Sequence, residues 1–211
     1  MSSNLRRQDP QSIAPGAVTT PPTSAAATHV ARTALRRLCL ARFAFAVAWA
    51  GLLATTASSL GAFAAVLLVT YPAFDVAAAI IDGRASARAG AWPAALSLNI
   101  AISTVAAVGL AVAGAADIPT VLRVWGAWAV ASGIVQLVVG RARRHLGGQW
   151  PMMLSGGISA VAGSSFVLSA SDAVSMSMVA GYAVLGGVFF LASAVRLGRS
   201  SRATAPSSQE C

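Results

Sequence analysis

The sequence predicts an all-α integral membrane protein, with six transmembrane helices arranged as three parallel two-helix repeats and both termini in the cytoplasm. Hydrophobic residues make up 56% of the 211 residues and charged residues only 10%, whereas a soluble domain carries about 25% charged residues. A helix needs about 20 mostly apolar residues to cross a hydrocarbon core of about 30 Å. Six segments meet this requirement, at roughly 39–57, 60–81, 92–114, 119–140, 150–170 and 173–197. Because they lack β-strand alternation, a helical bundle is favoured over a barrel.

The connectors between these segments predict three tight hairpins and their orientation. The connectors at 56–59, 115–119 and 170–172 are very short, whereas those at 82–91 and 141–149 are longer and basic. All 15 basic residues are arginine, and 14 of them lie at the end of the bundle that carries the termini and the basic connectors. Since positive residues are retained in the cytoplasm, this end is predicted to be cytoplasmic. The net charge of +9 therefore indicates topology, and no nucleic-acid partner is expected.

The two ends of the chain have too little apolar area to offset the chain entropy lost on folding. Residues 32–42 carry four arginines and predict a basic amphipathic segment on the anionic lipids of the inner leaflet. The chain therefore divides into a disordered cytoplasmic N-terminal tail at 1–31, a six-helix membrane domain at 32–198 with repeats at about 38–84, 92–143 and 150–198, and a disordered cytoplasmic C-terminal tail at 199–211.

An internal repeat is the most specific feature of the sequence. The pattern W-P-x-x-L-S-x-x-I occurs at 92–100 and again at 150–158. Tryptophan prefers the membrane–water interface, and proline is tolerated in the first turn of a helix. We therefore predict that four residues anchor two helices at the cytoplasmic interface: Trp92, Pro93, Trp150 and Pro151.

The repeat resembles a known family. A G-R-x-x-R-x-x-G-x-x-W connector precedes L-S-G-G-I, and an aromatic residue followed by A-V-x-[SG]-G occurs at 128–133 and 182–187. In these features the chain resembles the HdeD-like acid-resistance membrane proteins, most closely over Val124–Phe166 and loosely over about 38–198. The resemblance implies six spans in a bacterial inner membrane and, for the named member, a role in survival at low pH. One departure is Asp75-Val76, where family members often have Asp-Gly.

Asp75 is the acidic residue that lies deep in a predicted span. It follows Ser59 by 16 residues, and Arg42 precedes Ser58 by 16 residues. At 1.5 Å per residue, both lie about 24 Å from the turn between the first two spans. We therefore predict an intramembrane ion pair between Arg42 and Asp75. Its structural interpretation is that the pair holds the first hairpin together, and the alternative is that Asp75 exchanges protons. The structural interpretation is favoured, because an adjacent arginine stabilises the ionised carboxylate.

Other polar and small residues in the spans have structural interpretations. Arg123 is expected to extend to the outer interface, towards Asp117, and Asn99 and Gln136 to form hydrogen bonds between helices. Three small-xxx-small spacings predict close helix packing within the subunit: Ala129 with Gly133, Ser159 with Gly163, and Ala183 with Gly187.

No catalytic constellation is recognisable. His29 and His145 have no partners at metal-ligand spacing, and no G-x-S-x-G precedes a helix. Cys39 and Cys211 are both expected in the reducing cytoplasm, so no disulfide is predicted. We expect a non-enzymatic protein without cofactor or metal. Its expected partners are the lipid bilayer and, at the arginine-rich cytoplasmic face, anionic inner-leaflet lipids, and the sequence leaves a homo-oligomer open. The expected role is acid or envelope stress tolerance. The alternatives are a small transporter or proton-conducting channel that uses Asp75, and a membrane scaffold for partner proteins.

Overall fold

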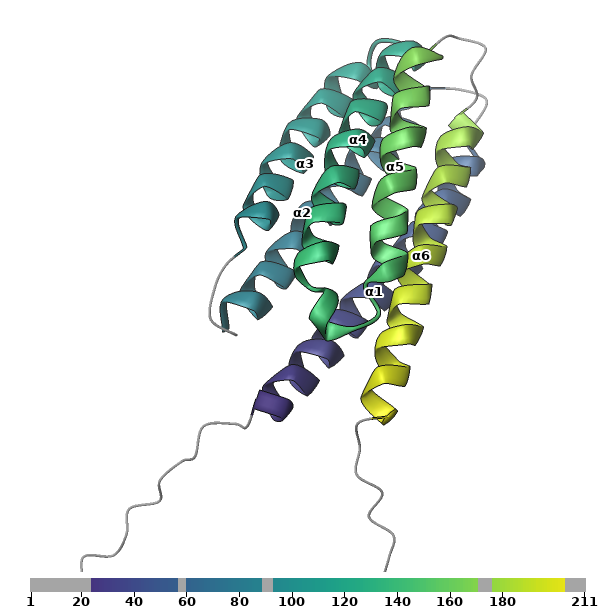
Figure 1. The fold of residues 1–211 in the computed structure, drawn as a ribbon. Coiled ribbons are helices and arrows are strands. Elements are labelled where there is room, and N and C mark those ends of the chain that lie inside the picture. The colour runs from purple at the N-terminus through teal and green to yellow at the C-terminus, as the bar shows by residue number, and fades with distance from the viewer. Residues whose placement is uncertain (1–23, 57–59, 89–92, 171–175, 204–211) are drawn as a thin grey trace, which may run out of the picture.

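The computed structural model describes residues 24–56, 60–88, 93–170 and 176–203 (Figure 1). These residues contain helices and no strand. Each of the six long helices is apolar and long enough to cross a membrane, which indicates a multi-pass membrane protein. The elements are α1 (Ser24–Ala54), α2 (Ala62–Arg88), α3 (Ala94–Ala113), α4 (Ile118–Ala142), the 3₁₀ turn η1 (Arg144–Leu146), α5 (Trp150–Leu168) and α6 (Met176–Ala203).

Three helices extend beyond the bounds predicted from hydropathy. Helix α1 begins at Ser24, so residues 24–31 belong to a helix and not to the predicted tail, and α6 continues through Ala203 into the predicted C-terminal tail. Helix α2 runs through Arg88, so Asp82 lies inside a helix and not in a connector. The predictions were wrong here because hydropathy marks only the apolar portion along a helix, and these three helices continue through polar and basic residues beyond that portion. The rest of both predicted tails lies outside the described residues.

The N-terminal part of α1 contacts the rest of the protein instead of forming a separate surface segment. The 31 residues of α1 give a length of about 46 Å at 1.5 Å per residue, which exceeds the hydrocarbon thickness. Figure 1 shows its first turns extending, with the end of α6, beyond the other helices. There Arg32 donates a hydrogen bond from Nε to the carbonyl oxygen of Leu146, at 2.8 Å. This contact joins α1 to the connector between α4 and α5.

The six helices form a closed ring. Each helix packs on its neighbours in sequence, and α1 also packs on α6. The most extensive contacts are those of α4 with α5, α1 with α6 and α2 with α3, while α1 with α2 and α5 with α6 make far fewer. Two of the three predicted hairpins, α1 with α2 and α5 with α6, are therefore loosely packed although their connectors are short. The tightest contacts lie between hairpins.

Glycines explain the tight contact between α4 and α5. A Cβ atom added to Gly133 would lie 2.6 Å from the carbonyl oxygen of Gly156, and one on Gly163 would lie 2.5 Å from that of Gly126. No side chain fits at these points, so the two backbones touch. The close approach predicted from the small-xxx-small spacings is present here. At the α1–α6 contact, a Cβ on Gly187 would lie 3.2 Å from the Ala46 side chain.

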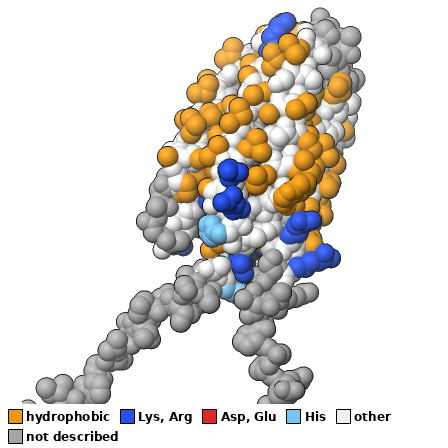
Figure 2. Space-filling model, in the orientation of Figure 1, with side chains coloured by type: hydrophobic (Ala, Val, Ile, Leu, Met, Phe, Trp, Pro, Cys, Tyr) orange, Lys and Arg blue, Asp and Glu red, His pale blue; other side chains and the backbone are white. Residues whose placement is uncertain are grey.

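The outer surface of the ring is apolar over its length and basic near one end. Val105, Val112 and Val161 are 72, 70 and 74% exposed, which suits a surface in contact with lipid. Figure 2 shows apolar side chains over the body of the visible face and most of its basic side chains towards the end where α1 begins and α6 ends.

Candidate functional site

A cavity with both polar and apolar walls lies on the axis of the ring. It has a volume of about 80 Å³ and is lined by side chains from all six helices. Among these side chains are the two carboxylates Asp75 and Asp82, the guanidinium of Arg42, and several serines and aromatic rings. The cavity therefore brings together polar residues that are distant in sequence.

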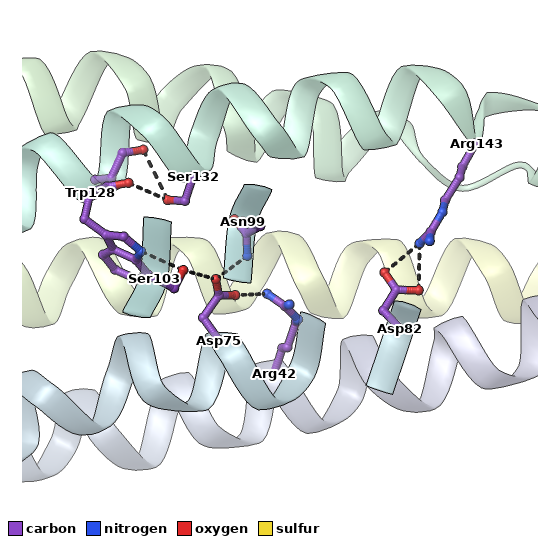
Figure 3. Close-up of polar contacts among 9 residues, drawn as sticks. Arg42, Asp75, Asp82, Asn99, Ser103, Trp128, Ser132 and Arg143 are labelled. Carbon is purple, nitrogen blue, oxygen red and sulfur yellow. Dashed lines mark hydrogen bonds and ion pairs between the residues drawn. The ribbon is translucent and has the colours of Figure 1, made fainter. Parts of the chain in front are cut away.

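Asp75 is the centre of a hydrogen-bond network at this cavity (Figure 3). The residue is only 7% exposed. Its Oδ1 accepts a bond from Nη1 of Arg42 at 2.6 Å, and its Oδ2 accepts bonds from Nδ2 of Asn99 at 2.6 Å and Oγ of Ser103 at 2.9 Å. Nε1 of Trp128 in turn donates to Oγ of Ser103 at 3.0 Å. The network thus joins α1, α2, α3 and α4, and each carboxylate oxygen has a partner.

The ion pair between Arg42 and Asp75 is the one that residue counting from the turn predicts. The two side chains are 15% and 10% exposed. The guanidinium carbon of Arg42 also lies 5.2 Å from the centroid of the Phe190 ring, in a cation–π contact with α6. Because a buried charge that loses its partner destabilises a fold strongly, Arg42 fixes the relative positions of α1, α2 and α6.

A second ion pair, absent from the sequence prediction, lies nearer the end that carries the termini. Nη1 of Arg143 donates to both oxygens of Asp82 at 2.9 and 2.7 Å, and its Nη2 donates to Oγ of Ser86 at 2.8 Å. The sequence prediction assigned Asp82 and Arg143 to two connectors. The spacing between Asp75 and Asp82 could have indicated that Asp82 also faces the other helices. Seven residues are about two helical turns, so both side chains lie on one face of α2.

Four aromatic rings close the axis on the side of Asp75 away from the termini. We call Trp49, Tyr71, Trp125 and Trp128 the aromatic layer. Neighbouring ring centroids in it lie 4.7 to 5.7 Å apart, and Nε1 of Trp49 donates to the carbonyl oxygen of Leu67 at 2.6 Å. Tyr71 and Trp128 line the cavity, whereas Trp49 and Trp125 do not and are at most 2% exposed. The cavity therefore ends at this layer.

Three of the four predicted interfacial anchors lie at the starts of two helices. Pro93 is the N-cap of α3 and Pro151 lies in the first turn of α5. Trp150, the first residue of α5, is 65% exposed, and Trp92 lies outside the described residues. Their position relative to a membrane interface stays a prediction.

Other polar residues agree with the sequence prediction only in part. Asn99 forms an interhelical hydrogen bond, as predicted, but Oε1 of Gln136 is buried without a partner among the described residues. Asp117 caps α4 by accepting a bond from the N–H of Thr120 at 2.7 Å, and no ion pair joins it to Arg123 in the described structure. The hydrogen bonds from Thr120 lower the pKa of Asp117 below its ordinary value, and the charge of Arg123 adds to this shift.

The site has no recognisable catalytic or metal-binding group within the described part of the chain. No cluster of three or more His, Cys, Asp or Glu side chains is placed to hold a metal there, and Cys39 is a buried free thiol packed against apolar side chains. Comparison with protein-family models, curated proteins and solved structures found no match to this chain. The fold and the site thus define the class only as a multi-pass helical membrane protein with a buried polar centre.

Proposed function

We propose that this chain is a non-enzymatic protein of a bacterial inner membrane, similar to the HdeD-like proteins, that acts in acid or envelope stress tolerance without conducting protons. The observation that carries the proposal is the closure of the ring axis. The aromatic layer fills the axis on one side of Asp75, and the oxygens of that carboxylate are occupied by donors from α1 and α3. The stress role itself rests on the resemblance of the repeat.

The charge distribution supports an orientation with both termini in the cytoplasm. Nine arginines outside the two ion pairs lie in the N-terminal half of α1, the last turns of α2, α4 and α6, or the connector after α4. Positive residues are retained in the cytoplasm, and each contributes about 1 kcal/mol near anionic lipid. These arginines are Arg32, Arg36, Arg37, Arg84, Arg88, Arg141, Arg144, Arg196 and Arg199.

The physiological part of the proposal is tested by acid challenge of a deletion strain. We expect survival to fall on deletion and to be restored by the wild-type chain and by Asp117→Asn, a carboxylate-to-amide change at an exposed helix cap. Asp75→Asn should restore survival to the extent that the protein still folds, since protonation of Asp75 is not part of the proposed role. Unchanged survival of the deletion strain would remove the stress role.

Proton flux into proteoliposomes separates this proposal from a proton-conducting channel. A channel needs a continuous polar path across the membrane, and the aromatic layer interrupts the axis. We expect no flux above that of empty vesicles. Flux through the wild-type protein that disappears in Asp75→Asn would contradict the proposal and establish the channel.

A membrane scaffold is the remaining alternative, because the basic end of the bundle offers a surface to acidic partners. Crosslinking in native membranes separates the two. We expect the protein to be recovered without a stoichiometric partner of another kind, and consistent recovery of such a partner would favour the scaffold.

A further inference from the structure

The six helices form two units that pack more tightly within themselves than against each other. One unit is the pair of α1 with α6, and the other contains α2, α3, α4 and α5. The two loose contacts of the ring, α1 with α2 and α5 with α6, are the boundaries between these units. Because fewer contacts are lost at these boundaries, the two units can move against each other at a lower cost than one helix can leave its unit.

Two neighbouring glycines of α6 show which helix α6 packs against. A Cβ atom added to Gly187 would lie 3.2 Å from the side chain of Ala46 in α1, whereas one added to Gly186 would have no atom within 4 Å. Gly186 lines the central cavity. The face of α6 that carries Gly187 is therefore in close contact with α1, and the face that carries Gly186 borders open space.

The boundary between α1 and α2 is held by strong side-chain contacts. The ion pair of Arg42 with Asp75 crosses it at 2.6 Å. The rings of Phe45 and Phe74 stack across it, with their centroids 3.8 Å apart. Since separating a buried ion pair is costly, this boundary stays joined when the two units move, and it acts as their hinge.

Tyr182 of α6 makes specific side-chain contacts across the boundary between α5 and α6. Its ring meets the ring of Phe166 edge-on, with the centroids 5.8 Å apart, and its hydroxyl forms a hydrogen bond with Ser159. No ion pair between described residues crosses this boundary. Ser159 and Tyr182 both line the central cavity, so the cavity lies directly behind the boundary.

The connector before α5 is pinned to α1 and α6 near the end that carries the termini. Gly148 in this connector has a φ of +68°, and a Cβ atom added to it would lie 3.1 Å from the backbone nitrogen of Leu197 in α6. Arg32 of α1 donates a hydrogen bond to Leu146 of the same connector. A separation of α5 from α6 would therefore widen towards the opposite end of the bundle.

We propose that the ring opens laterally between α5 and α6, with Tyr182 as the latch and the boundary between α1 and α2 as the hinge. The pair of α1 with α6 moves as one unit, and the opening gives molecules dissolved in the bilayer a path to the central cavity. The path leads sideways into the lipid and not along the axis of the ring. This opening goes beyond the proposed stress role and does not depend on it.

Spin labels on the lipid-facing surface measure the opening. One pair of labels, at Val161 of α5 and Val184 of α6, spans the proposed opening. Two control pairs share these labels: Ile134 of α4 with Val161 lies inside the four-helix unit, and Val47 of α1 with Val184 lies inside the other unit. All four side chains are exposed. The labels are attached to cysteines in a background without the two native cysteines, and double electron–electron resonance in lipid nanodiscs gives the distances.

We expect two distances for the pair that spans the opening and one narrow distance for each control pair. Tyr182→Phe keeps the ring but removes the hydroxyl, so it should raise the population of the longer distance roughly two- to tenfold, the factor that one hydrogen bond represents. Ser132→Ala is the matched control, because Ser132 lines the same cavity but donates its hydrogen bond within α4, to the carbonyl oxygen of Trp128. It should leave the two populations unchanged.

Three results would overturn the proposal. A single narrow distance between α5 and α6, in the wild type and in Tyr182→Phe alike, would mean that the ring does not open there. Equal broadening of all three pairs would mean that the helices do not move as two units. An effect of Ser132→Ala as large as that of Tyr182→Phe, or no effect of Tyr182→Phe, would remove the latch. Circular dichroism and gel filtration check that each variant is folded.

Discussion

Replacing Arg42 by Met would leave the Asp75 carboxylate buried without its countercharge. The two side chains are 15% and 10% exposed, so the pair behaves as a buried one. Removing one partner of such a pair costs about 3–5 kcal/mol of folding free energy. Asp75 would keep its bonds from Asn99 and Ser103, and we therefore expect a loss near the lower end, about 3 kcal/mol.

The double variant Arg42→Met/Asp75→Asn distinguishes lost charge pairing from lost packing. With no charge left to bury, it should be more stable than Arg42→Met alone by roughly 2 kcal/mol, which would appear as a coupling between the two sites. Unfolding in mixed micelles by sodium dodecyl sulfate, followed by tryptophan fluorescence, measures the difference. Arg123→Met is the matched control, because Arg123 is exposed on α4 and its replacement should change stability little. A loss below about 1 kcal/mol for Arg42→Met, or strict additivity in the double variant, would refute the reasoning.

Three further predictions concern packing, the hydrogen-bond network and pH. Gly133→Ala should destabilise the bundle by about 1–3 kcal/mol, because the new Cβ would lie 2.6 Å from a backbone oxygen of α5. Gly181→Ala is the control and should not destabilise it, because nothing lies within 4 Å of the new Cβ. The same unfolding titration in mixed micelles compares the two variants. Trp128→Phe should cost about 1 kcal/mol through the lost bond to Ser103, and an unchanged midpoint would argue against that bond. The cap at Asp117 stabilises the fold above the ordinary carboxyl pKa and loses this effect as pH falls through its lowered pKa. Thermal unfolding from neutral pH to about pH 3 should therefore depend on pH more strongly in the wild type than in Asp117→Asn, which keeps a good cap but cannot titrate.

Part of the candidate site was predictable because depth in a membrane can be counted along the chain. A short turn between two helices sets a common origin, and each residue adds 1.5 Å, so Arg42 and Asp75 could be placed at one level from their spacing. The same count does not show which way a side chain points or which helix lies opposite. For that reason the donors Ser103 and Trp128 were not predicted. The pair of Asp82 with Arg143 was not predicted because both residues were assigned to connectors.

The sequence by itself determined that the chain has six apolar helices, because the length of an apolar run decides whether a helix can cross lipid. It also determined the one-sided distribution of arginine, since that is a property of the order of residues. Only the tertiary structure decided that the helices close into a ring whose tightest contacts lie between hairpins, because Gly133, Gly156 and Gly163 act only when two helices bring them face to face. The aromatic layer and the central cavity have the same origin: they are made by residues from helices far apart in sequence, whose meeting depends on helix rotation and packing.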